Sequence, residues 1–125
     1  MSISNYYEDM ILNHMIRNQA FTPPSAIYVS LHTADPGETG TSEVTGGSYA
    51  RQVITFGAPS NGVITVSNTP EFSGMPAQAG IGWVGLWDSL LAGSNNCLWL
   101  GALTTPRDVL AGDTLRLTAF TVTLT

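Results

Sequence analysis

After Pro24 the sequence divides into short apolar or alternating stretches separated by turn-forming residues, and this pattern constrains the fold more than any other feature. Such punctuation predicts a mainly β protein, an antiparallel β-sandwich or jelly roll. The expected strands are 27–32, 49–56, 63–67, 81–88, 97–104 and 114–124. The expected turns are Asn61-Gly62, Ser73-Gly74, Gly93-Ser94-Asn95 and Ala111-Gly112-Asp113. We therefore expect a single β-sandwich domain over residues 23–125.

Residues 1–22 are the one segment with a helical pattern. Ser2 or Ser4 can cap the N-terminus, and Thr22-Pro23-Pro24 is expected to end the helix because proline lacks an amide donor. The helix could pack on its own domain or dock onto a neighbouring subunit, and both alternatives stay open. Its apolar stripe, which supplies interface candidates, comprises Tyr7, Met10, Ile11, Leu12, Met15 and Ile16.

Three of the expected strands carry further information. Strand 27–32 alternates apolar and polar residues, which is typical of a half-buried strand. Stretches 81–87 and 97–103 are apolar on both faces, so we expect central strands covered on both sides. In 114–124 the apolar phase changes face, which predicts a β-bulge near Thr118-Ala119 or a crossing between sheets.

Charged residues make up only 10% of the chain, and its four cations are all arginines. Soluble domains carry about 25% charged residues, and interfaces are depleted in lysine and glutamate. Much of the surface is therefore expected to be covered by other subunits. The net charge of −5 argues against nucleic-acid binding. No apolar run is long enough for membrane insertion, and the N-terminus does not have the pattern of a secretory signal peptide.

No catalytic, cofactor or metal signature is found, and an enzyme is not expected. The single cysteine, Cys97, lies in an apolar stretch and is interpreted as a core residue, so no internal disulfide forms. His14 and His32 lack metal-ligand spacing to other residues. His32 and Asp35 form a His-x-x-Asp pair at a turn. Its expected role is a hydrogen bond that fixes the entrance of the following loop, with metal binding the weaker alternative.

That loop covers residues 34–47 and is expected to contain neither helix nor strand. A loop of this length can reach a neighbouring subunit or remain a solvated surface loop. Arg51 follows it within a strand, where a cation in a charge-poor protein needs an acceptor. We expect a clamp between subunits, or between strand and loop, onto Glu38 or Glu43. An ordinary exposed strand position is the alternative.

Trp83 and Trp87 lie four residues apart in an expected strand, hence on one face, with Gly85 between them. Apolar neighbours favour a place in the core or in a subunit interface. If exposed, the two indoles could instead form a stacking platform for a sugar.

Three motifs resemble a family of small virion proteins of tailed bacteriophages, often labelled tail fibre proteins. They are Leu-His-Thr-Ala-Asp-Pro at 31–36, Gly-Gly-Ser-Tyr-Ala-Arg-Gln at 46–52 and Gly-Leu-Trp-Asp at 85–88. The resemblance covers nearly the whole chain. It implies a structural virion protein that is made in the bacterial cytoplasm, with no catalytic or cofactor residues.

The resemblance does not specify where in the virion the protein lies. A fibre shaft needs repeats or coiled-coil heptads, and this chain has neither. We therefore expect a capsid decoration or cement protein, a homo-oligomer and most simply a trimer, that contacts the major capsid protein. The alternative is a tail-fibre, tail-tip or baseplate subunit that contacts tail or baseplate proteins and the host surface, with or without glycan binding.

Overall fold

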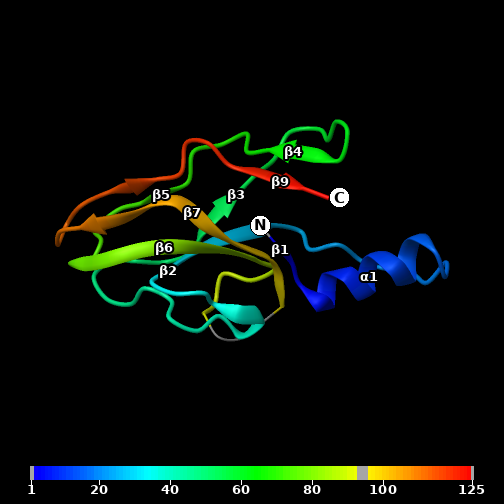
Figure 1. Ribbon diagram of the computed structural model, residues 1–125, viewed down its shortest axis with the longest axis horizontal. Coiled ribbons are helices and arrows are strands. Elements are labelled where there is room, and N and C mark those ends of the chain that lie inside the picture. Colours follow the sequence, from blue (N-terminus) through cyan, green and yellow to red (C-terminus); the bar gives the residue numbers. More distant parts are fainter. Residues whose placement is uncertain (1, 93–95, 125) are drawn as a thin grey trace.

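The computed structural model describes residues 2–92 and 96–124, and the turn expected at Gly93-Ser94-Asn95 lies outside them. The protein is mainly β with one helix near the N-terminus, as predicted (Figure 1). The helix is α1 (Asn5–Met15), and a 3₁₀ turn, η1, covers Gly37–Thr39. The strands are β1 (Ser2–Ile3), β2 (Ile27–His32), β3 (Gln52–Ile54), β4 (Val63–Thr65), β5 (Glu71–Phe72), β6 (Gln78–Trp87), β7 (Cys97–Val109), β8 (Leu115–Arg116) and β9 (Thr121–Thr123).

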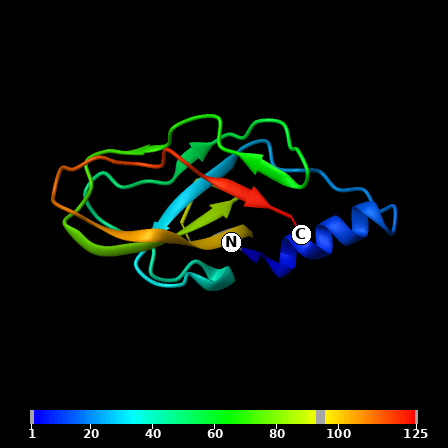
Figure 2. The same cartoon turned by 45° about the horizontal axis from the view of Figure 1, so that its top comes forward.

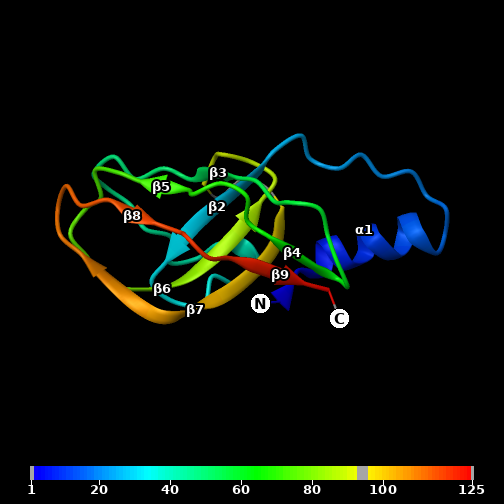
Figure 3. The same cartoon turned by 90° about the horizontal axis from the view of Figure 1, so that it is seen from above.

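The strands form two layers. One is a five-stranded antiparallel sheet in the order β1-β7-β6-β2-β3, and the other contains two short pairs, β4-β9 and β5-β8 (Figure 3). Side chains from both layers meet in one apolar core, so the packing is sandwich-like. The core includes Val29, Leu31, Val84 and Leu86 from the large sheet, Phe72, Leu115 and Val122 from the small pairs, and Leu117 and Phe120 from the segment that joins β8 to β9.

The last stretch crosses between the two small pairs, one of the two outcomes expected from its change of apolar phase. β8 pairs with β5, whereas β9 pairs with β4. The backbone changes partner between Leu117, whose N–H donates to Pro70, and Phe120, whose carbonyl accepts from Val66. The change of face keeps both halves of the stretch directed into the core.

The turn at Asn61-Gly62 forms as predicted. Both residues have positive φ, at 51° and 76°, the conformation of a two-residue hairpin turn. Ser60 and Val63 on either side exchange two backbone hydrogen bonds of 2.9 and 3.0 Å.

Strands β1 and β5 were not expected from the sequence, and β2 and β7 differ from the strands that were. β2 is not half-buried, because Ser30 and His32 on its polar face are fully buried. Residues 33–47 fold back over that face, with a β-bridge between His32 and Glu43. β7 continues through Pro106 to Val109. Proline is tolerated there because β1 covers only Trp99 and Leu100 of this edge.

The helix ends seven residues earlier than predicted, at Met15 rather than near residue 22. Ser4 is the N-cap, and its hydroxyl accepts the Tyr7 N–H at 3.1 Å. At the other end Asn18 adopts a left-handed conformation with φ 55°. Asparagine in this conformation is a common helix terminator, so the chain turns back before it reaches the prolines.

Helix α1 and the segment that returns to β2 project from one end of the β domain (Figures 1 and 2). We call residues 5–26 the helical arm. No residue of α1 is fully buried. The arm contacts the domain mainly through β7, where the ring of Tyr7 lies 5.5 Å from that of Trp99.

Candidate assembly surfaces

Two regions contain the residues that the sequence singles out: a buried polar cluster beneath the loop 33–47, and the exposed helical arm. We call the first the loop-anchor cluster and define it by six residues from the three motifs and their surroundings. They are Ser30, His32, Glu43, Tyr49, Arg51 and Trp87.

Arg51 and Glu43 form a clamp between strand and loop, one of the alternatives that the sequence left open. The Arg51 Nε donates to Glu43 Oε1 at 2.9 Å, and Nη2 donates to Oε2 at 3.1 Å. Both side chains are almost completely buried. The guanidinium also donates to the Ser89 carbonyl and lies 4.4 Å from the centroid of the Trp87 ring. A bidentate pair with these additional partners satisfies the buried charges.

His32 anchors the loop through the backbone of Thr41. Its Nδ1 lies 2.8 Å from the Thr41 carbonyl, which can only accept, so Nδ1 carries the proton. Nε2 then accepts from the Ser30 hydroxyl at 2.6 Å. Burial lowers the pKa of His32, which favours this neutral form. The expected hydrogen bond at the loop entrance therefore exists, but its partner is Thr41. Asp35 instead accepts the Gly37 N–H.

Tyr49 joins the loop to the centre of strand β2. Its hydroxyl accepts the Leu31 N–H at 2.9 Å and donates to Glu43 Oε1 at 3.0 Å. Burial raises the pKa of Tyr49 far above its usual range, so the hydroxyl keeps the proton that it donates. Its ring stacks on Phe72 in the core at 5.7 Å.

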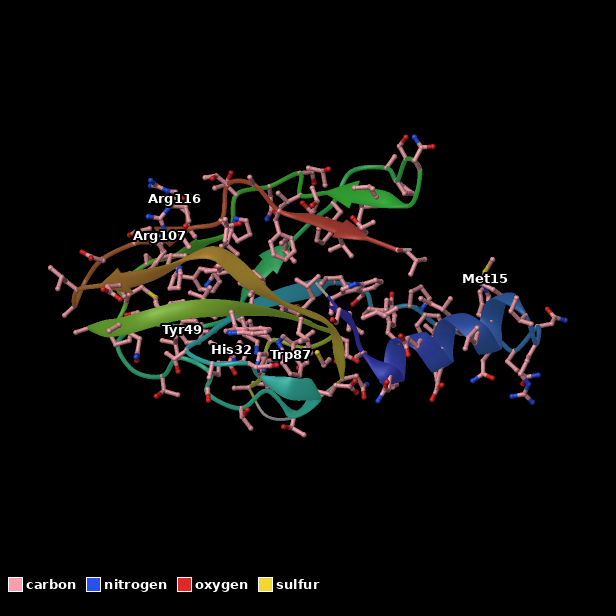
Figure 4. All side chains as sticks on the ribbon, in the orientation of Figure 1. Met15, His32, Tyr49, Trp87, Arg107 and Arg116 are labelled. Carbon is pink, nitrogen blue, oxygen red and sulfur yellow. The ribbon has the colours of Figure 1, made fainter. Side chains whose placement is uncertain are left out.

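Two glycines make room for Trp87. The indole Nε1 donates to the Ser30 hydroxyl at 2.7 Å. A Cβ on Gly85 would lie 2.7 Å from that nitrogen, and a Cβ on Gly40 would lie 2.8 Å from the far edge of the ring. The glycine of the Gly-Leu-Trp-Asp motif is thus explained by close approach. Figure 4 shows His32, Tyr49 and Trp87 in the region covered by the loop.

The two tryptophans do not form an exposed pair. Trp87 is buried in the loop-anchor cluster, whereas Trp83 is half-buried. The expectation that Trp87 belongs to the core region is met, and a flat two-indole platform for sugars is not present in this structure.

The interface candidates on the helix divide between two faces. Tyr7 packs on its own domain, with its ring also 6.0 Å from that of Phe21, and burial raises the pKa of its phenol. Ile11 is half-buried beside a groove. Met15 is 71% exposed. Part of the stripe therefore packs on the domain, as the first alternative expects, and part remains uncovered.

Glu38 links the loop to the helix rather than to Arg51. Its Oε1 accepts the backbone N–H of Asn5 at 2.8 Å, at the first turn of α1. A carboxylate is favourable there because helix N-termini carry unpaired donors and a partial positive charge. The base of the arm is thus attached to the same loop that the cluster anchors.

The described residues contain no group of three or more side chains suited to hold a metal ion. Cys97 is buried, as expected, and burial raises its thiol pKa to about 12, so it is not a nucleophile at neutral pH. Within residues 2–92 and 96–124, no helix has both the length and the apolar character needed to cross a bilayer.

The family signal extends over almost the whole chain. A family model described as podophage GP4 fiber I protein gp80 matches residues 2–125, and no curated protein matches. Four residues of the loop-anchor cluster, His32, Tyr49, Arg51 and Trp87, lie in the three motifs that resemble phage virion proteins. The chain belongs to the podophage GP4 fiber I protein gp80 family and is a phage fibre protein, a structural component of the virion.

Proposed function

We propose that this protein is a non-enzymatic tail-fibre subunit that is held in the fibre by its helical arm. The observation that carries the proposal is the uncovered apolar face of that arm in a member of a fibre family. Leu12, Met15 and Ile16 are more than half exposed on a short projecting helix. Apolar surface of this kind is typical of binding sites between subunits.

The fibre description supports the tail-fibre alternative over the head decoration that the sequence pattern favoured. That preference depended on the lack of shaft repeats, but a fibre can also contain compact modules joined to each other or to a separate shaft. The proposed partners are copies of this chain and tail or baseplate proteins. The major capsid protein would be the partner only if the protein decorates the head.

A tail-fibre subunit could also contact the host surface. The pair Trp83 and Trp87 does not support sugar binding in such a contact. Trp87 is closed off by the loop 33–47, with residues of that loop on the indole ring. The loop-anchor cluster is therefore interpreted as a structural device, and the exposed surface that remains is mostly Thr, Ser, Asn and Gly.

The position in the virion can be measured directly. Gold-labelled Fab fragments raised against the purified protein would be bound to intact virions and imaged by electron microscopy. Label confined to the tail or its fibres is the expected result. Label spread over the head would overturn the tail-fibre proposal in favour of decoration. Virions that lack the gene product, prepared in parallel, control for non-specific labelling.

A further inference from the structure

The uncovered face of helix α1 combines exposed apolar residues with charged residues beside them. Leu12 and Met15 are 57% and 71% exposed, and Ile16, the C-cap residue, is 77% exposed. At 100° per residue these three positions lie within about a third of the helix circumference. Met15 points outward from the arm (Figure 4).

Opposite charges flank this face near its two ends. Asp9 is exposed in the first half of the helix, and Arg17 is exposed just beyond its C-terminus. The Arg17 guanidinium donates to Asn13 Oδ1 at 2.8 Å, which directs it to the same side of the face as Asp9.

The other side of the face borders a groove. Its volume is about 390 Å³, and it lies between the first half of the helix and the C-terminal end of the chain. Ile3, Glu8, Ile11, Leu12 and Leu124 line it. Most of these side chains are apolar, and Leu124 is 53% exposed.

We propose that the arms of two copies pair as antiparallel helices around a two-fold axis near Asn13. In this arrangement Met15 of each copy enters the groove beside Ile11 of the other. Asp9 of each copy then faces Arg17 of the other. A two-fold axis makes both contacts occur twice, as an isologous interface requires.

The occupant is a second copy because the face is complementary to itself. The exposed apolar residue near the C-terminal end matches the groove near the N-terminal end, and the rim charges match in the same antiparallel order. In a parallel pair each Asp9 would lie level with the other Asp9 on the opposite side of the face, so no Asp9 would face an Arg17. The inference names a partner for the arm and rests on the proposed assembly role.

The test measures mass in solution and does not depend on the position in the virion. The purified wild-type protein would be measured by light scattering at several concentrations, and we expect an even number of copies. The double variant Leu12→Glu/Met15→Glu is expected to halve that mass. Leu110→Glu is the matched control, because Leu110 is 73% exposed and lies on the turn between β7 and β8, outside the arm. It should leave the mass unchanged.

Charge reversal tests the antiparallel order. Asp9→Arg places two like-charged contacts between identical copies, and so does Arg17→Asp, so each variant alone should dimerise about 2- to 5-fold more weakly. A mixture of the two variants restores both opposite-charge contacts and should form heterodimers preferentially. Circular dichroism would verify that each variant is folded.

Three results would overturn the proposal: a monomeric wild type, a mass that the arm variants leave unchanged, or charge variants that fail to pair with each other. Label on the head of the virion would overturn the fibre role while leaving the pairing intact. Failures of the two proposals are therefore distinguishable.

Discussion

The loop-anchor cluster and the helical arm differ in whether their side chains are buried and have partners within the chain. In the cluster, Glu43 and Arg51 are buried and paired. On the arm, no helical residue is fully buried, and Leu12 and Met15 remain uncovered. Four of the six cluster residues lie in the motifs, whereas no residue of the arm does. The motifs therefore hold the domain together, and the surface best suited for assembly lies outside them.

The largest expected effect is the loss of the buried ion pair. Glu43→Gln leaves the Arg51 charge without its carboxylate in a site shielded from solvent, which we expect to lower the free energy of unfolding by about 3–5 kcal/mol. Chemical denaturation would measure it. Glu71→Gln is the control, since it breaks the exposed Arg116–Glu71 pair and should cost about 0–1 kcal/mol. Equal effects of the two substitutions would contradict the comparison.

A smaller effect is expected from a single added methyl group. Gly85→Ala would place a Cβ 2.7 Å from the Trp87 Nε1 and 3.0 Å from the Ser30 hydroxyl, and overpacking of this kind costs about 1–3 kcal/mol. Gly82→Ala, on the same strand, meets nothing closer than 3.6 Å and is the control. Thermal unfolding would compare them. A Gly85→Ala variant as stable as Gly82→Ala would show that the indole has room to move.

The stability of the protein is expected to depend on pH through His32. The folded-state pKa of His32 is lowered, so the unfolded chain takes up a proton at higher pH than the folded protein does. Stability is therefore fully present above about pH 6.5 and falls as the pH drops through that value, by at most about 1.4 kcal/mol per pH unit for one group.

Denaturation at pH 7.5 and pH 5.5 would measure this dependence. His32→Gln should flatten it, whereas His14→Gln, at an exposed position on the helix, should retain it. A wild-type protein whose stability did not change over this interval would contradict a buried neutral His32.

The smallest effect on stability is expected in the arm. Leu12→Gln and Met15→Gln alter exposed side chains, so each should change the unfolding free energy of the isolated chain by no more than about 0.5 kcal/mol. Denaturation should be done at concentrations where the copies are dissociated, because association would add to the apparent stability. A loss above about 2 kcal/mol would show that the helix packs more tightly on the domain than the structure indicates.

Local chemistry explains which parts of the fold could be predicted from the sequence. The turn at Asn61-Gly62 depends on neighbouring residues and is found as predicted. Ser4 as N-cap and the crossing before Phe120 are each one of the two alternatives that the sequence offered. The sequence narrowed the partner of Arg51 to Glu38 or Glu43, because few carboxylates lie near it, and the structure shows Glu43.

The remaining features depend on contacts between distant segments. The helix ends at Met15 because Asn18 turns the chain. The sequence prediction placed the end near residue 22 because it relied on the prolines that follow. β2 became buried on both faces only when the loop 33–47 folded over His32, which strand periodicity cannot reveal. The bond between Trp87 and Ser30 joins residues 57 positions apart. The groove beside the helix likewise needs Leu124 to lie against the arm.

The most direct test of the division between fold and assembly is incorporation into virions. Phage lacking the gene would be complemented with wild type, with Leu12→Glu/Met15→Glu or with Leu110→Glu, and copies per virion would be counted by quantitative mass spectrometry. The arm variant should be folded and as stable as wild type in isolation yet depleted from virions, while Leu110→Glu is incorporated normally. Incorporation of the arm variant at the wild-type level would contradict the assignment of assembly to the helical arm.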